Sequence, residues 1–460
     1  MAKVISKSGI DFTDGKLLRK FILFAIPIIL ANFLQQFFTV ADSIVIGQFA
    51  GPDSLGAVTA STPIVNLAIM SFVGLSVGVN VVVSQAIGRK QEDRAHRAVH
   101  TSMLFALIVG TIVGLIGFFL AKTFTNLIGV DQVLKEKNST YIGVYFLGTP
   151  AVMVYNFGAN VLRAKGDSKR PLYFLLISGI LNVGLNLIFV ICFHMDVLGV
   201  ALATIISQVV SAVLVVIRMT KEKDCTKLEI KKLRFYKNEL LSVLATGVPS
   251  MISGIIFNVS NLIIHRAVNA ISPSATTGNG IASNIENFTY LAMNSVYTTT
   301  LTVVGQNYGA NKFDRIKKAM GIGIVFVTIV GIVLGGISYI FRDALCSLFT
   351  GADTPVEVLE FAKERMLFIL FTYALCGMQE IFVAGIRGLG YSTVSTIVSF
   401  FFACVFRVIW IYTAYASLKT NLVLFISYPI SWALLILSQG VMFAYLFKKL
   451  KKKSVKSSQD

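Results

Sequence analysis

Charged residues are scarce in this chain, and the motifs that indicate an enzyme are missing. Only 14% of the 460 residues are charged, against roughly a quarter in globular domains, which argues against a soluble protein. The five cysteines (Cys192, Cys225, Cys346, Cys376 and Cys404) show no metal-type spacing, so neither a disulfide framework nor a zinc site is expected. The chain has no Walker motif, no G-x-S-x-G elbow and no H-E-x-x-H. We therefore expect no cofactor and no enzymatic activity.

Long apolar runs take the place of these features. Hydrophobic residues make up 55% of the chain and the mean hydropathy is +0.75. Runs such as 101–120 and 171–193 reach the ~20 residues that cross ~30 Å of hydrocarbon as a helix. The sequence therefore predicts an all-α membrane protein with twelve transmembrane helices. The expected spans are 17–46, 54–86, 95–121, 139–162, 170–193, 196–219, 239–268, 276–307, 316–342, 357–386, 392–415 and 421–447.

The basic residues are distributed unevenly between the two sides of these spans. Five lie in the amino terminus (Lys3, Lys7, Lys16, Arg19 and Lys20), eight in 218–237 and six in the tail, while the odd-numbered loops are nearly bare. An excess of Lys and Arg marks the cytoplasmic side. We expect a multi-pass protein of the cell (inner) membrane with both termini in the cytoplasm. The net charge of +18 then reflects loops facing anionic lipid, and nucleic acid is not expected as a partner.

The chain also repeats itself. The segment QAIGRKQEDRAHRA (85–98) returns as QNYGANKFDRIKKA (306–319), an offset of 221 residues. Pro27 and Pro249 lie 222 apart, and RAKGDS (163–168) matches RGLGYS (387–392) at 224. We expect an amino-terminal lobe at 1–219, a basic cytoplasmic linker at 220–237 and a carboxy-terminal lobe at 238–460. Six spans per half make the repeats parallel, with a pseudo-twofold axis along the membrane normal, as in transporters whose substrate path lies between rocking halves.

Polar side chains at similar depth indicate a cation site in the first lobe. Asp42 lies about 6 Å from the outer end of its span, and Asn186 and Thr204 lie about 10–12 Å from theirs. Asn182 precedes Asn186 by one turn and shares its helix face. A carboxylate, two amides and a hydroxyl are oxygen ligands that suit a hard cation. The alternative is that the two asparagines only bond neighbouring helices.

Charged residues within the second half of the chain are further candidates, because a charge in a membrane is costly to bury. Glu286 and Arg407 fall at comparable depths, and they are interpreted either as a structural ion pair or as a proton or substrate site. Glu380 precedes Arg387 by seven residues, which favours a structural pairing between these two.

Five motifs occur at the helix ends and connecting loops: ADSIVIGQFAG, SQAIGRK, RAKGDSKRP, VGQNYGANKFDR and IRGLGYS. They resemble motifs of the multidrug and toxic compound extrusion (MATE) family. The resemblance covers the whole chain and is of the bacterial or archaeal type. It implies a cation site made of Asp42, Asn182, Asn186 and Thr204, with a bend at Pro27. The family has Asp where this chain has Asn186, which weakens the case for Na+ and favours H+ with Asp42 as the titrating group.

The function implied is a multidrug efflux antiporter. The antiporter would be driven by H+ or Na+ as the coupling ion, and Na+, if it is the ion, would bind transiently at Asp42. It would export small, mostly cationic organic compounds by alternating access. A monomer is expected, with membrane lipids as its surroundings. The alternatives are a lipid-linked oligosaccharide flippase of the same superfamily and, in another class, a membrane-embedded enzyme or receptor.

Overall fold

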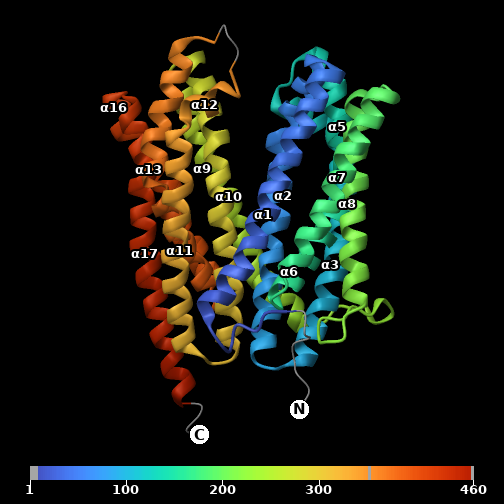
Figure 1. Ribbon diagram of the computed structural model, residues 1–460, viewed down its shortest axis with the longest axis vertical. Helices are drawn as coiled ribbons and strands as arrows, with labels where there is room; N and C mark the ends of the chain where they lie inside the picture. The colour runs from blue at the N-terminus through green and yellow to red at the C-terminus, as the bar shows by residue number, and fades with distance from the viewer. Residues whose placement is uncertain (1–8, 351–353, 457–460) are drawn as a thin grey trace. The chain divides into compact units, whose positions relative to one another are not determined.

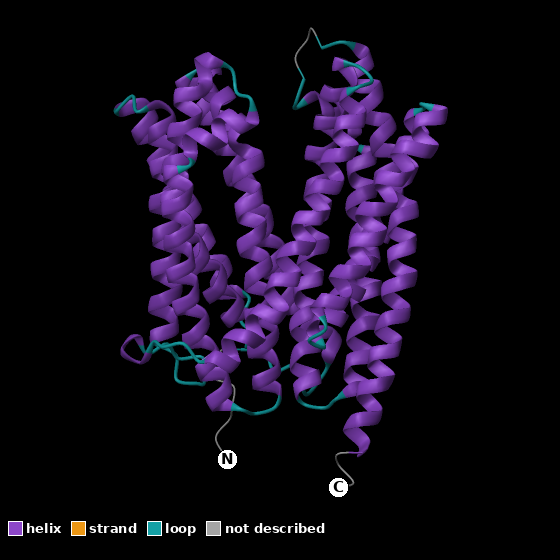
Figure 2. Ribbon diagram, turned by 180° about the vertical axis from the view of Figure 1, so that it is seen from behind, coloured by secondary structure: helices purple, strands orange, loops and turns teal. Residues whose placement is uncertain are grey.

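The structure is a computed structural model that describes residues 9–350 and 354–456. Within these ranges every regular element is a helix, the connections are short and no strand occurs (Figure 2). In lipid, each backbone N–H and C=O must be bonded inside its own segment, and a helix meets that requirement. The prediction of an all-α membrane protein is confirmed. Lys3 and Lys7, counted above for orientation, lie outside the described residues.

The helices follow one another in two series. The first series is α1 (Leu17–Val45), η1 (Ile46–Ala50), α2 (Pro52–Gly88), α3 (Glu92–Phe119), α4 (Ala121–Ile128), η2 (Gln132–Leu134), α5 (Lys135–Leu147), α6 (Thr149–Ala164), α7 (Lys169–Leu187), η3 (Ile188–Cys192) and α8 (Asp196–Thr220). The second series is η4 (Ile230–Lys232), α9 (Lys237–Asn269), α10 (Pro273–Gly309), α11 (Phe313–Ile340), α12 (Arg342–Ser347), α13 (Val356–Gly388), α14 (Ser392–Ser399), η5 (Phe400–Val405), α15 (Phe406–Trp410), η6 (Ile411–Tyr415), α16 (Ala416–Leu418) and α17 (Asn421–Lys456).

Ten helices of the described ranges are long and apolar enough to cross a membrane, and the bent pair α5 and α6 provides an eleventh span if counted as one. Each of these coincides with a span expected from the sequence. The remaining expected span, 276–307, corresponds to α10. This 37-residue helix is rich in Thr, Ser and Asn, which lowers its hydropathy below that of the other spans.

The span expected at 139–162 is bent by 46° between α5 and α6. Pro150 stands in the first turn of α6 and has no N–H to bond the carbonyl four residues earlier. That carbonyl, of Phe146, instead accepts a hydrogen bond of 2.8 Å from Thr149 Oγ1, which also lies 2.9 Å from the carbonyl oxygen of Gly110. A hydroxyl therefore replaces the missing backbone donor at the bend.

The chain divides into two compact units that do not follow the halves of the sequence strictly. Unit 1 contains Ile26–Met251 and the chain up to Asp11, and unit 2 contains Phe12–Ala25 and Ile252–Asp460. The first turns of α1 thus belong to unit 2, and the first turns of α9 belong to unit 1. Both changes fall within two residues of a helix-interior proline, Pro27 in α1 and Pro249 in α9. These are the two prolines that the sequence repeat pairs.

The same packing pattern occurs in each unit. In unit 1, α6 packs against α2, α3 and α8, and α7 packs against α8. In unit 2, α13 packs against α10, α11 and α17, and the broken helix α14–α15 packs against α17. Figure 1 shows α2, α3 and α6 of the first unit running alongside one another, as α11, α13 and α17 do in the second. The internal repeat of the sequence is therefore also a repeat of structure.

The repeated motifs form matching turns. Lys90 and Asn311, 221 residues apart, both adopt positive φ, at 58° and 56°. The amide of the residue after each, Gln91 or Lys312, bonds the carbonyl five residues back at 2.9 Å. Gly166 and Gly390 form the second matched pair, with φ of 92° and 93°. The motifs were recognisable in sequence because they end helices in the same way in both units.

The linker expected at 220–237 is docked on unit 1 rather than extended into solvent. Its Cys225 and Leu228 are buried in the apolar core of that unit. Lys165 Nζ lies 2.7 Å from Glu222 Oε1, and both side chains are almost fully buried. Burial raises the pKa of the Cys225 thiol to about 12, so this cysteine remains a neutral packing residue.

Candidate functional site

The carboxylate of Asp42 on α1 lies beside two asparagines of α7. Asn186 Nδ2 donates a hydrogen bond to Asp42 Oδ1. With its amide nitrogen turned toward the carboxylate, as its neighbours require, Asn182 lies 2.8 Å from Oδ1 and 3.3 Å from Oδ2. The two asparagines are one turn apart, so a single face of α7 presents both to α1. The structure brings these three residues together, and their part in ion coupling stays a prediction.

Thr204, the fourth residue of the expected set, is engaged elsewhere. It is half-buried on α8, and its Oγ1 donates to the carbonyl oxygen of Val200 at 2.9 Å. This bond to the preceding turn is common for Thr in helices and leaves the oxygen lone pairs free to accept. Thr204 is thus not bonded to Asp42 in this conformation.

An apolar cluster with two tyrosines packs next to Asp42. Val45 at the end of α1 and Ile46 at the start of η1 lie one turn further along the chain. They are buried with Val190 of η3 and with Tyr141 and Tyr145 of α5. The two tyrosine rings stack at 6.1 Å, and Tyr141 interacts electrostatically with Asp42. The sequence analysis missed these tyrosines, although their i, i+4 spacing inside an expected span was visible. Their effect is to lower the local dielectric around the only carboxylate of the site.

The donor arrangement around Asp42 is that of an ionised carboxylate, and it turns few oxygen ligands toward a metal ion. Both amides present N–H groups to the carboxylate, whereas Na+ requires oxygen ligands. Asn186 Oδ1 is buried without a hydrogen-bond partner, so one acceptor is in place. Across the described parts of the chain, no group of three or more His, Cys, Asp or Glu side chains is placed to hold a metal ion. A proton on Asp42 Oδ2 would turn the Asn182 amide so that its oxygen accepts.

In unit 2, Glu286 pairs with a residue other than the one expected. Arg365 of α13 makes two parallel bonds to it, Nε to Oε1 at 3.1 Å and Nη2 to Oε2 at 2.7 Å. All of these atoms are buried. The expected ion pair between Glu286 and Arg407 is therefore wrong. A bidentate guanidinium–carboxylate pair has the geometry that best offsets the desolvation of both charges.

The pair continues into a chain of side chains. Arg365 Nη1 donates to Asn279 Oδ1 at 2.8 Å, and Asn279 Nδ2 lies 2.6 Å from His265 Nδ1. Arg365 was missed in the sequence because it follows Lys363 and Glu364, a charged stretch typical of a helix end. It lies nine residues inside α13, and its position within the expected span was the available signal.

Arg407 belongs to a different group of contacts. It lies on α15, between the π-helical segments η5 and η6, and is 1% exposed. Its Nε donates to Ser431 Oγ at 3.1 Å and its Nη1 to Asn261 Oδ1 at 3.1 Å. Its Cζ lies 4.5 Å from the ring centroid of Tyr428, a ring that Arg365 also approaches, at 5.4 Å. Arg365, the partner of Glu286, and Arg407 therefore approach the same tyrosine ring.

Glu380 lies near its expected partner without a direct bond to it. Gln379 Nε2 donates to Glu380 Oε1 at 2.7 Å, while Arg387 interacts with Glu380 electrostatically and donates from Nη1 to the Tyr297 hydroxyl at 2.8 Å. Its carboxylate therefore has one amide donor and a nearby positive charge.

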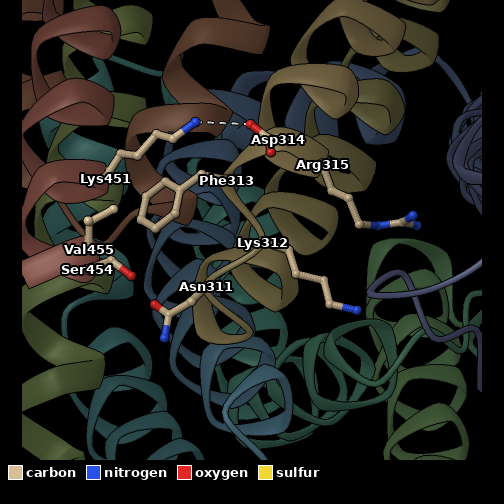
Figure 3. A pocket seen from close by; sticks show the side chains of 8 residues that line it. All are labelled: Asn311, Lys312, Phe313, Asp314, Arg315, Lys451, Ser454 and Val455. Carbon is tan, nitrogen blue, oxygen red and sulfur yellow. Dashed lines mark hydrogen bonds and ion pairs between the residues drawn. The ribbon is translucent and has the colours of Figure 1, made fainter. Parts of the chain in front are cut away.

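The second copy of the repeated motif lines a shallow surface pocket between the start of α11 and the end of α17 (Figure 3). Its ion pair joins Lys451 Nζ to Asp314 Oδ1 at 3.1 Å. Figure 3 shows the Arg315 side chain directed away from Lys451. Its guanidinium donates to the carbonyl of Phe12 at 2.8 Å and to that of Asp14 at 3.0 Å. This motif anchors the segment before α1 to unit 2 and has a structural role.

These features define a class of protein: a multi-pass membrane protein with a single amide-bonded carboxylate in its first span and an internal repeat. Comparison with known families gives a match to the MatE model over residues 27–188 and 249–413. The chain belongs to this family, which consists of membrane transporters and not of enzymes, and the resemblance seen in the sequence is confirmed. The two matched segments begin at Pro27 and Pro249.

Individual relatives agree with this assignment. The probable multidrug resistance protein YoeA of Bacillus subtilis (strain 168) is 26% identical over 440 residues, covering 94% of each chain. A crystal structure of a MATE protein in complex with MaL6 superposes with a TM-score of 0.91 at 20% identity, over 97% of this chain and 100% of the other. An outward-facing multidrug resistance MATE family transporter gives 0.90 at 21% identity, over 98% and 100%. These structures establish a shared fold.

Proposed function

We propose that this protein is a multidrug efflux antiporter that exports small, mostly cationic organic compounds and is driven by the inward movement of H+. Family membership and the multidrug resistance relatives support drug export. One observation carries the choice of H+: the Asp42 carboxylate receives amide N–H groups from both Asn182 and Asn186. Na+ remains the second candidate, because the unpartnered Asn186 Oδ1 supplies one ligand oxygen.

Protonation of Asp42 would change the bonding between α1 and α7. The ionised carboxylate accepts from two amides, whereas a protonated one also donates, so at least one amide rotates. The two states of the site therefore favour different contacts between the helices. A coupling ion biases a conformational equilibrium only through such a difference in affinity for the two states. Alternating access of the two lobes, 1–219 and 238–460, follows from this bias.

Orientation is part of the proposal. Both termini and the linker 220–237 lie in the cytoplasm, so that Asp42 takes up its proton from the outer side of the inner membrane. The one-sided distribution of Lys and Arg supports this orientation. A monomer is part of the proposal as well, and the division of one chain into two compact units supports it.

The test is transport in proteoliposomes with H+ and Na+ gradients imposed separately. With ethidium as the substrate, the wild-type protein should respond to the H+ gradient. Asp42→Asn should reduce that response to the level of protein-free vesicles, at least about tenfold, because the amide cannot titrate.

Asp53→Asn is the matched control. Asp53 is an exposed carboxylate in the first turn of α2, in the same unit, and its loss should leave transport unchanged. Gradient-driven transport of normal rate in Asp42→Asn would remove Asp42 from the mechanism. A response of the wild-type protein to Na+ alone would replace H+ by Na+.

A further inference from the structure

Among the buried hydrogen-bond donors of unit 2 that have no acceptor, two lie around the same aromatic ring. Arg407 Nη2 and Trp432 Nε1 are both buried without a partner. Arg407 is 1% exposed and Trp432 is 2% exposed. The Arg407 guanidinium lies over Tyr428, and the Trp432 ring lies 5.7 Å from the same tyrosine, one helical turn further along α17. An unsatisfied buried donor costs about 1–3 kcal/mol, more when charged, so two of them together need an explanation.

The positive charge of Arg407 is not neutralised by the surrounding side chains. Its three side-chain hydrogen bonds go to Ser431, Ser260 and Asn261, which are all neutral. In the described part of unit 2, Glu286 is engaged by Arg365 instead. A charged side chain within a membrane span, without an opposite charge, marks a functional site by default. What the site lacks is an acceptor with negative charge.

Aromatic side chains surround the two donors. Trp432 packs against Tyr428 and Tyr373, at ring distances of 5.7 and 5.6 Å. Asn261, which contacts Arg407, is half-buried, so the guanidinium is next to a side chain that reaches the surface of the unit. The π-helical segments η5 and η6 flank Arg407 on both sides, and such segments are frequent at functional sites. Flat rings suit aromatic neighbours, and an oxyanion suits the two donors.

We propose that Arg407 and Trp432 form an oxyanion-binding site in unit 2, which takes the carboxylate or phosphate group of a flat aromatic substrate. The inference rests on the proposed export function and identifies the residues that would hold an anionic group of a substrate. The guanidinium fork binds the oxyanion through Nη2, Trp432 adds the indole N–H, and Tyr428 and Tyr373 contact the ring system. Arg365 remains the structural partner of Glu286.

A pair of dyes isolates the carboxylate. Rhodamine 19 carries a free carboxylate, and rhodamine 6G is its ethyl ester, with the same ring system. Binding to the purified full-length protein in detergent is measured by fluorescence anisotropy. The wild-type protein should bind the acid more tightly than the ester. In Arg407→Met this acid-to-ester ratio should fall about tenfold, equivalent to ~1.4 kcal/mol.

Two further variants serve as checks. Trp432→Phe removes the indole N–H while keeping an aromatic ring and should lower the ratio about threefold, which tests the site even if Arg407→Met fails to fold. Arg266→Met removes the same charge from an exposed position on α9 of the same unit and should leave the ratio unchanged. Equal acid-to-ester ratios in the wild-type protein, Arg407→Met and Trp432→Phe would overturn the proposal. Both N–H groups would then donate to water molecules and not to a substrate. Failure of the wild-type protein to bind either dye would also overturn it.

Competition tests the wild-type protein alone. Benzoate should displace rhodamine 19, and neutral benzamide at the same concentration should not; equal displacement overturns the inference. Displacement by dihexanoyl phosphatidic acid would identify a lipid headgroup as the source of the oxyanion, and its failure would identify a soluble substrate. Rhodamine 6G transport driven by an H+ gradient tests the export function separately. If neither dye is transported although the acid-to-ester binding ratio is as expected, the proposed export function is contradicted and the oxyanion site is not.

Discussion

At the scale of the residue, we expect the amide at position 186 to decide which ion the proposed Asp42 site accepts. Asn186→Asp would place a second carboxylate beside Asp42. Two carboxylates at this distance attract a cation more strongly and raise the affinity for a proton as well. We expect ethidium transport under a Na+ gradient to rise on the order of tenfold, measured in proteoliposomes.

Asn182→Asp is the informative comparison for this variant. Asn182 also contacts Asp42, but only Asn186 has an amide oxygen buried without a partner. If the second carboxylate must replace that oxygen, Na+ dependence should appear in Asn186→Asp and be weaker in Asn182→Asp. No Na+ response in either variant would contradict the ligand role of position 186.

The Glu286–Arg365 pair makes a second prediction at this scale. Arg365→Met leaves a buried carboxylate without its partner and should cost about 3–5 kcal/mol of unfolding free energy. Glu286→Met leaves the guanidinium alone and should cost a similar amount. The double variant removes both charges and should recover most of the loss. Thermal unfolding in detergent measures all three, and additive losses in the double variant would show that the two residues do not act as a pair.

Counting residues from helix ends predicted the Asp42 site but not its counterpart in unit 2. The rise of a helix is regular, so an expected depth follows from sequence position, and the structure shows Asp42 in contact with Asn182 and Asn186. Depth does not reveal which helices are neighbours. Arg407 was expected at a depth comparable to that of Glu286, yet α10 packs against α13, and Arg365 on α13 bonds the carboxylate. A buried N–H group without an acceptor, such as Trp432 Nε1, can be recognised only when the side-chain contacts are known.

At the scale of the element, apolar length predicted nearly all of the spans because a helix is the only way for this backbone to cross lipid. The interruptions were not predictable from hydropathy. The bend between α5 and α6 depends on Pro150 and on the Thr149 hydroxyl that replaces its missing donor. The π-helical segments beside Arg407 have no signature in the sequence. Irregular backbone of this kind depends on partners supplied by the rest of the fold.

The prolines of α1 and α9 lead to a prediction about movement. Pro27 and Pro249 each lie where their helix passes from one contact unit to the other. Each lacks the N–H that would bond the carbonyl of Leu23 or Ala245, four residues earlier. Pro27 was expected to be a hinge from the family resemblance, and the matching position of Pro249 makes it a second one.

We expect Pro249→Ala to slow transport on the order of tenfold without changing dye affinity, because a straightened helix moves less easily while the binding site is unaltered. Pro27→Ala should behave in the same way. Pro63→Ala is the control, since Pro63 is exposed within α2, far from either unit boundary. Transport rates in proteoliposomes, with anisotropy for affinity, separate the two effects. A normal rate in Pro249→Ala would assign a purely structural role to that proline.

At the scale of the whole molecule, the repeat is the property that sequence and structure share most closely. The same turn, with positive φ at Lys90 and at Asn311, closes α2 in unit 1 and α10 in unit 2. The same set of helix neighbours surrounds α6 and α13. Duplicated sequence therefore preserved local turns and helix packing, while the polar contents of the units diverged. Unit 1 retains a single carboxylate with amide donors, and unit 2 has a neutralised ion pair next to an unneutralised arginine.

The repeat also determines what labelling should show about orientation. Asp93 and Asp314 are 221 residues apart, exposed, and in the first turns of α3 and α11. Parallel repeats place both on the same side of the membrane, which the distribution of basic residues identifies as the cytoplasm. Gln132 and Ser417, which are exposed next to α5 and in α16, should lie outside.

The experiment uses single cysteines at these four positions in a variant whose five native cysteines are replaced by serine. A membrane-impermeant maleimide added to intact cells should label Gln132→Cys and Ser417→Cys only. The same reagent should label Asp93→Cys and Asp314→Cys only after the membrane is opened. An even number of spans in each half returns the chain to the side on which it began, so six spans per half require parallel repeats. Labelling of Asp93→Cys and Asp314→Cys from opposite sides would mean inverted repeats and would contradict the count of six spans in each half.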